Sequence, residues 1–126
     1  MTRPSFRILV IDDYAVMRTL AKQVLAMRGH RCEAVGTARA ALRAIESFKP
    51  DVAILEWSLR DGSGLGLAEQ LRARTRAQGR SLVVAALSAL DRPSDFREDV
   101  DAYFTKPVCL QEIEQLCGSL LHRAAG

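Results

Sequence analysis

Five side chains that could do chemistry stand at the ends of apolar stretches in this sequence. If those stretches are parallel strands, their carboxyl ends meet at one edge of a sheet, which is where such folds bind ligands. We therefore expect the side chains to converge on one site. In chain order they are Asp12, Asp13, Glu56, Ser88 and Lys106.

Carboxylates gathered at one site repel each other, because two unit charges ~4 Å apart cost roughly 4 kcal/mol at an effective dielectric constant near 20. Mg²⁺, a hard cation that prefers oxygen ligands, relieves this repulsion, and Lys106 is a second source of positive charge. A hydroxyl and an ammonium beside a metal ion also match the oxygens of a phosphoryl group. Asp12 or Asp13 alone would more often be a helix cap, but convergence of several strand ends favours a metal or phosphoryl site.

The elements that must position these residues can be read from the periodicity of the sequence. Apolar residues at helical spacing, such as Val16, Leu20 and Val24, predict a helix after each of the first three strands and a last helix from residue 108. Continuous apolar strands alternating with helices predict an α/β fold, with a parallel sheet covered on both faces. Strands are predicted over residues 6–11, 31–36, 51–55, 82–87 and 101–105.

Composition indicates one globular domain over residues 1–126, with 48% apolar and 26% charged residues. No apolar run approaches the ~20 residues that span a membrane, and the N-terminus has no secretory pattern. We expect a cytoplasmic protein without membrane association. The formal charge of +3 is too small to indicate nucleic acid binding.

The cysteines lack CxxC spacing and are expected to be reduced core thiols: Cys32, Cys109 and Cys117.

The sequence contains the acid pair DD at 12–13, the strand PDVAILEW, the turn DGSGL, and the segments LSA and YFTKPV. Together these motifs resemble the response-regulator receiver domains of two-component signalling, especially the single-domain chemotaxis type. The resemblance covers about residues 6–122. It implies a flavodoxin-like, doubly wound, five-stranded parallel sheet with strand order 2-1-3-4-5.

The resemblance also implies a metal site. In the family, the acid pair and the carboxylate that ends the third strand hold Mg²⁺, together with the backbone carbonyl two residues later. Here these are Asp12, Asp13, Glu56 and the carbonyl of Ser58. We expect weak Mg²⁺ binding, with Asp12 acting mainly through water, unless Lys106 neutralises Glu56 directly and leaves the site empty.

Three further residues take their roles from the family pattern. Ser88 and Lys106 are expected to contact the phosphoryl group, and Tyr103, three residues before the lysine, corresponds to the rotameric switch. The lysine must turn back into the pocket, so the resemblance also implies a cis peptide bond between Lys106 and Pro107. A generic X-Pro bond is cis in only ~5% of cases.

Glu56 departs from the family, in which this position is an aspartate that accepts the phosphoryl group. The extra methylene moves the carboxylate ~1 Å, and a misplacement of that size can cost a hundredfold in rate. The longer acid can reach toward Ser88 and Lys106 and partly imitate a phosphorylated aspartate. We therefore interpret Glu56 as a metal ligand and structural switch holder at the phosphoacceptor position.

A second departure is the short crossover at residues 89–100, which contains Pro93 and barely suffices for a parallel connection with its helix. The fourth helix of the family is therefore expected to be shortened or absent, and the partner-binding face remodelled. Trp57, beside the acceptor position, is predicted either to contact a partner or to pack against a neighbouring loop.

The chain is thus predicted to be a stand-alone receiver or pseudo-receiver that acts by protein–protein interaction and is not an enzyme. Its partner would be a signalling protein such as a histidine kinase or a downstream effector, and the chain itself a monomer or weak homodimer. A phosphotransferase with an aspartyl nucleophile usually has its two acids one residue apart, whereas Asp12 and Asp13 are adjacent. A nucleotide-binding relative of flavodoxin would need a phosphate loop where DDYAV stands.

An alternative function rests on the arginine run LRARTRAQGR near the end of the third helix. It could bind an anionic ligand or a nucleotide second messenger. Cations near the negative end of a helix dipole, exposed to solvent, explain the same pattern. The run contains Arg72, Arg74, Arg76 and Arg80.

Overall fold

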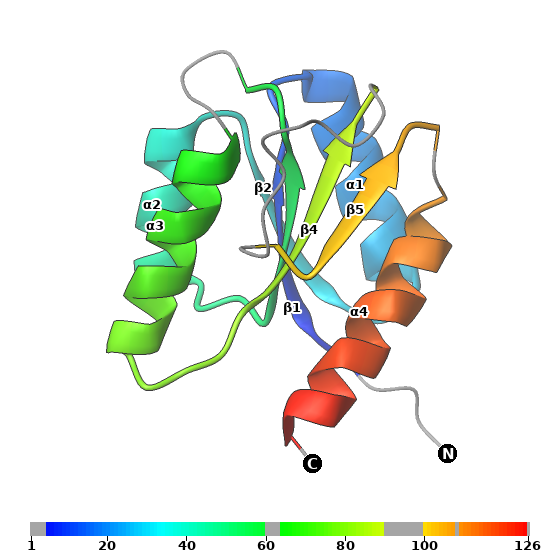
Figure 1. Cartoon of the computed structure of the whole chain (residues 1–126). Helices are drawn as coiled ribbons and strands as arrows, with labels where there is room; N and C mark the ends of the chain where they lie inside the picture. Colours follow the sequence, from blue (N-terminus) through cyan, green and yellow to red (C-terminus); the bar gives the residue numbers. More distant parts are fainter. Residues whose placement is uncertain (1–4, 60–63, 90–99, 108, 126) are drawn as a thin grey trace.

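The strands form one parallel sheet in the order β2-β1-β3-β4-β5, as predicted. The computed structural model describes residues 5–59, 64–89, 100–107 and 109–125. All strand arrows point toward the same end of the molecule (Figure 1). The strands are β1 (Arg7–Ile11), β2 (Arg31–Val35), β3 (Val52–Glu56), β4 (Val83–Ser88) and β5 (Ala102–Thr105).

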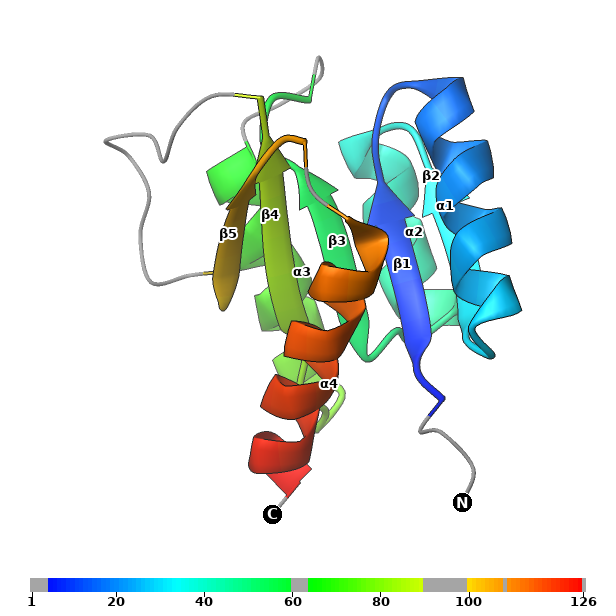
Figure 2. The same cartoon turned by 90° about the vertical axis from the view of Figure 1, so that its right-hand side faces the viewer.

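Helices cover both faces of the sheet, which makes the fold doubly wound. Helices α2 and α3 lie on one face and α1 and α4 on the other (Figures 1 and 2). The sheet therefore separates two apolar clusters, one containing Leu55 and Leu71 and the other Ile54 and Ile113. The helices are α1 (Ala15–Met27), α2 (Ala38–Ser47), α3 (Gly64–Ala77) and α4 (Leu110–Ala125).

Local sequence signals set several of the element boundaries. The hydroxyl of Thr37 accepts a hydrogen bond from the amide of Ala40 at 3.1 Å and so caps the start of α2, as predicted. Gly29 has a φ of 92° just after α1, a conformation that costs glycine little, and this confirms its role as a helix stop. All six residues of β4 are buried, which agrees with the unbroken apolar run LVVAAL.

The helix that is expected to be shortened or absent between β4 and β5 falls largely on residues 90–99. These residues lie outside the described ones, so this expectation stays a prediction.

The expectation that all the cysteines are core thiols is wrong for Cys109, which is exposed. Burial raises the pKa of the Cys117 thiol to about 12 and that of Cys32 to about 11.

In the described parts of the chain, no helix has the length and apolarity needed to cross a membrane.

A group of polar side chains, buried or half-buried, ties α4 to the end of α1. Glu114 accepts a hydrogen bond from Arg28 Nε at 2.6 Å and contacts His30 Nε2 with its other oxygen. His30 stacks on Phe6, and its Nδ1 accepts a hydrogen bond from the Phe6 amide at 3.0 Å. The side chains of His30 and Glu114 are 1% and 5% exposed, so their polar atoms depend on these contacts and not on water.

Replacing Glu114 with alanine should lower the free energy of unfolding by roughly 3 kcal/mol, because Arg28 and His30 then remain buried without their acid. Urea denaturation measures this change. Glu112→Ala is the matched control on an exposed position of the same helix, and should cost less than about 1 kcal/mol. Equal losses for the two variants would contradict the structural role given to Glu114.

Candidate functional site

The carboxyl edge of the sheet holds the predicted site residues. Asp12 and Asp13 follow β1, Glu56 and Ser88 are the last residues of β3 and β4, and Lys106 follows β5. Main-chain hydrogen bonds extend the ladder one residue beyond the strands and fix these positions. The Asp12 amide donates to Val35 O at 3.0 Å, and the Lys106 amide donates to Ser88 O at 2.7 Å.

The ammonium of Lys106 lies between two carboxylates. Its Nζ is 3.2 Å from Glu56 Oε1 and 3.8 Å from Asp12 Oδ2. The side chains of Asp12 and Glu56 are 5% and 12% exposed, whereas that of Lys106 is 25% exposed. Acids this poorly solvated need a positive charge nearby, because water no longer stabilises them. The structure thus brings Asp12, Glu56 and Lys106 together as expected.

Asp12 also organises the start of α1. Its Oδ1 accepts a hydrogen bond from the Tyr14 amide at 2.9 Å, while Tyr14, the N-cap residue, makes no side-chain cap. The Asp12 carbonyl accepts a hydrogen bond from Arg18 Nη1 at 2.9 Å. Arg18 was not singled out from the sequence, although a cation in the helix that follows an acid pair was a usable signal. Asp12 therefore both fixes the turn that leads into α1 and supplies a pocket acid.

Glu56 retains an unused acceptor. Its Oε2 is buried and has no hydrogen-bond partner among the described residues. Such an oxygen, beside a second buried acid, matches the all-oxygen ligand preference of Mg²⁺. However, the described residues contain no group of three His, Cys, Asp or Glu side chains placed to hold a metal ion. An ion here would rest on one or two carboxylates with carbonyl and water ligands, which is usual for Mg²⁺.

The other predicted site residues differ in their exposure. Ser88 is 3% exposed, Asp13 is half-buried, and Ser58 is exposed two residues beyond Glu56. The Lys106–Pro107 peptide bond is cis, which confirms the expectation drawn from the family pattern.

Trp57 packs inward instead of facing a partner, which decides between the two readings of this residue. It is 8% exposed and meets the ring of Tyr103 edge-on, with centroids 6.2 Å apart and planes at 79°. Gly64 approaches it closely, donating from its amide to Trp57 O at 3.0 Å. A Cβ at position 64 would lie 2.8 Å from that oxygen, so only glycine fits at this place in the turn.

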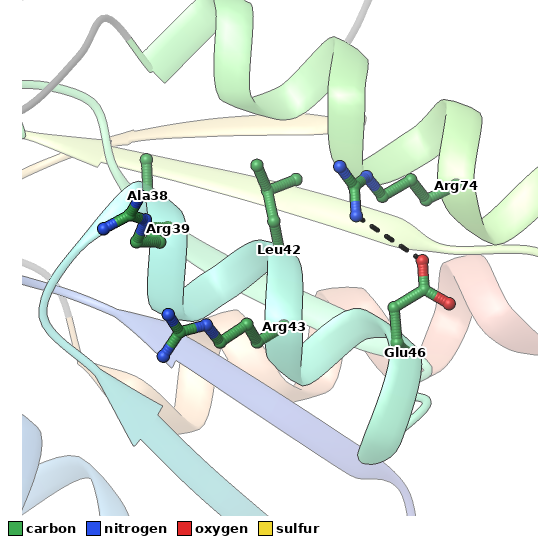
Figure 3. Close-up of a pocket in the computed structure, with 6 residues that line it drawn as sticks. All are labelled: Ala38, Arg39, Leu42, Arg43, Glu46 and Arg74. Atoms are coloured by element: carbon green, nitrogen blue, oxygen red, sulfur yellow. Dashed lines mark ion pairs between the residues drawn. The ribbon is translucent and has the colours of Figure 1, made fainter.

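The arginine run does not form one site. Arg74 reaches from α3 toward α2, where its Nη1 is 3.5 Å from Glu46 Oε1 (Figure 3). Arg39 and Arg43 of α2 line the same groove of about 640 Å³, around the apolar Leu42. Arg72, Arg76 and Arg80 line a separate pocket. The predicted set of four arginines is therefore divided between two surfaces.

Comparison with known proteins identifies the class that this site and fold define. Residues 8–117 match the response regulator receiver domain, and the chain therefore belongs to this family. It is 31% identical over 124 residues to the two-component response regulator PhoP of Pseudomonas aeruginosa, covering 95% of this chain and 53% of that protein. The chain thus spans about half the length of this relative, and similarly of the PhoP proteins of Salmonella.

Solved receiver structures have the same fold. The receiver domain of Francisella response regulator 1452 has a TM-score of 0.78 and 26% identity, covering 94% of this chain and 98% of that one. The response regulator TrrA of Thermotoga maritima, in complex with Mg(2+)-BeF, has a TM-score of 0.77 and 27% identity, covering 90% and 97%. This chain therefore functions in two-component signalling as a receiver domain.

Substituting Lys106 with methionine should lower the free energy of unfolding by about 1–3 kcal/mol, because Asp12 and Glu56 lose the cation between them. Thermal and urea denaturation at neutral pH measure the loss. Lys22→Met removes the same charge from an exposed position on α1 and should change stability by no more than about 0.5 kcal/mol. A Lys106→Met protein as stable as the Lys22→Met control would show that the ion pair is not stabilising.

Proposed function

We propose that this receiver domain is a pseudo-receiver, in which the ion pair between Glu56 and Lys106 takes the place of phosphorylation. The observation that carries the proposal is the 3.2 Å contact between Lys106 Nζ and Glu56 Oε1. In the family pattern, the lysine contacts the phosphoryl group once an aspartate has accepted it. Here the longer acid makes that contact itself, without any added group.

The geometry around the pair supports this proposal. The extra methylene of Glu56 brings its carboxylate to the ammonium from the end of β3, and the cis peptide bond accompanies the lysine at the end of β5. Asp12 Oδ2, at 3.8 Å, is a second carboxylate contact of the same ammonium. An incoming phosphoryl donor would have to displace Lys106 from the carboxylates of Asp12 and Glu56. It would also have to react with a Glu56 carboxylate that lies ~1 Å from where an aspartate carboxylate would lie.

Mg²⁺ would be held by the carboxylates of Asp13 and Glu56 and the carbonyl of Ser58, with Asp12 acting mainly through water. The ion supplies charge neutralisation and orients oxygen ligands. The unpartnered Glu56 Oε2 supports such binding, as does the Mg(2+)-BeF complex of TrrA. Lys106 already neutralises part of the negative charge, so we expect the affinity to be weak.

The partner is proposed to be a signalling protein, either a histidine kinase or a downstream effector, and the domain itself is proposed to be without enzymatic activity. The response-regulator relatives support a role in signal relay. The binding surface is placed around residues 89–104, of which residues 90–99 lie outside the described residues. Because the ion pair needs no phosphoryl donor, the partner should bind without prior action of a kinase.

Incubation with acetyl phosphate and Mg²⁺ should add no phosphoryl mass to the protein as it stands, and intact mass spectrometry reads this directly. Glu56→Asp should restore labelling, because Asp12, Asp13, Ser88 and Lys106 are all retained. Glu56→Gln is the matched control that removes the acceptor, and it should stay unlabelled. Efficient labelling of the unmodified protein would refute the proposal, and so would an unlabelled but folded Glu56→Asp protein.

Titration with Mg²⁺ should change the fluorescence of Trp57, the only tryptophan, because its backbone directly follows Glu56. Saturation is expected only at millimolar ion concentrations, since Lys106 competes with the metal for the carboxylates. Glu56→Gln should weaken the response further. A titration without any fluorescence or calorimetric signal would favour charge neutralisation by Lys106 alone.

A further inference from the structure

A small pocket lies at the opposite edge of the sheet from Glu56 and Lys106. It has a volume of about 220 Å³ and is formed where α3 ends and the chain turns into β4. In Figure 1 this end of α3 is the one away from the strand arrowheads. The residues that line it are Arg72, Arg76, Arg80, Ser81 and Leu82.

The pocket carries excess positive charge. Arg72 Nη2 lies 2.5 Å from Asp101 Oδ2, and that same oxygen accepts a hydrogen bond from the Val84 amide at 2.8 Å, so this acid is already engaged. Arg76 is exposed, and its guanidinium group has no hydrogen-bond or ion-pair partner within the described part of the chain. Three guanidinium groups therefore line the pocket, and among the described residues only that of Arg72 is paired with a carboxylate.

Arg80 is held in place by the backbone of a distant loop. Its Nη2 donates to the carbonyls of Lys49 and Pro50 at 2.5 and 2.8 Å, and its Nη1 donates to Gln78 Oε1 at 3.3 Å. Such bonds orient the side chain but leave its positive charge uncompensated, because carbonyls and amides are neutral. A fixed guanidinium loses little further entropy when it binds an anion.

The arginine side chains are not needed as hydrogen-bond partners for the last carbonyls of α3. The carbonyl of Thr75 near the end of α3 accepts hydrogen bonds from the Gln78 and Arg80 amides, and that of Arg76 accepts one from the Gly79 amide. These last-turn carbonyls are thus satisfied by the chain itself. Arg72 Nε is a further donor that is buried and without a partner among the described residues.

We propose that this pocket, which we call the arginine pocket, binds a phosphate group, either as inorganic phosphate or carried by a mononucleotide. Guanidinium groups present forked donors that match phosphate oxygens, and the Ser81 hydroxyl is a neutral donor beside them. The volume is below the ~300–1,000 Å³ of sites that enclose a whole drug-sized ligand. A phosphate group is therefore the part of a ligand that the pocket encloses.

The arginine pocket can be tested independently of the pseudo-receiver proposal. It shares no lining residue with the pocket of Asp12, Glu56 and Lys106, and the six residues of β4 separate the two edges of the sheet. That separation is roughly 17 Å at ~3.3 Å per strand residue. It exceeds the ~10 Å over which exposed charges interact at 0.1 M salt.

The test is an amide NMR titration with inorganic phosphate, at constant ionic strength and with EDTA present to remove Mg²⁺. We expect saturable shifts at Ser81 and Leu82 and at the Nε–H groups of the pocket arginines. Arg76→Gln should weaken binding roughly tenfold, because one charged hydrogen-bond donor is lost. A parallel titration with a nucleoside monophosphate identifies the source: tighter binding than phosphate indicates a carried group, and equal binding indicates phosphate alone.

Arg74→Gln is the matched control, since it removes the same charge two residues away from a side chain that points to Glu46 (Figure 3). It should change the affinity less than twofold. Equal weakening by Arg74→Gln and Arg76→Gln would overturn the proposal, because binding would then reflect only overall charge. Shifts confined to Ser88 and Lys106 would also overturn it, by placing phosphate at the other edge of the sheet.

Discussion

The ammonium of Lys106 lies between carboxylates that come from two different strands, and the carboxyl edge of the sheet is organised around this contact. Asp12 and Glu56 are almost entirely removed from water, so their negative charges require a nearby cation. The lysine reaches them because its own amide continues the β4–β5 ladder by bonding to the Ser88 carbonyl. The parallel sheet thus turns residues that are far apart in the sequence into a compact ionic group.

Apolar packing next to the carboxyl edge of the sheet holds the ionic group of Asp12, Glu56 and Lys106 in place. Trp57 directly follows Glu56 and is fixed by the Leu87 carbonyl, the close approach of Gly64 and the ring of Tyr103. A glutamate attached to so rigid a support has little freedom except in its own side chain, whose additional methylene brings it to Lys106. The support that positions the residue at the end of β3 therefore also places the Glu56 carboxylate within 3.2 Å of Lys106 Nζ.

Charged side chains on this small domain gather at separate places, which differ in whether positive and negative charges are balanced. The acids at the carboxyl edge are paired internally with Lys106, and Arg28, His30 and Glu114 form a buried structural group between α1 and α4. The arginine pocket differs because its positive charge exceeds the carboxylate charge around it. Buried and balanced charges stabilise the fold, whereas exposed and unbalanced charges are available to a ligand.

The sequence by itself determined the strand and helix pattern, the cap at Thr37 and the stop at Gly29, because these depend on neighbours in the chain. Strand ends also sufficed to predict that Asp12, Glu56 and Lys106 converge, since parallel strands bring their carboxyl ends together. Only the tertiary structure decided that Trp57 is buried, that the arginine run divides between two surfaces, and that Glu114 meets Arg28 and His30. These outcomes depend on how each helix is rotated against the sheet. They also depend on contacts between residues far apart in the sequence, such as His30 and Glu114, which are separated by 84 positions. No local sequence pattern encodes either of these.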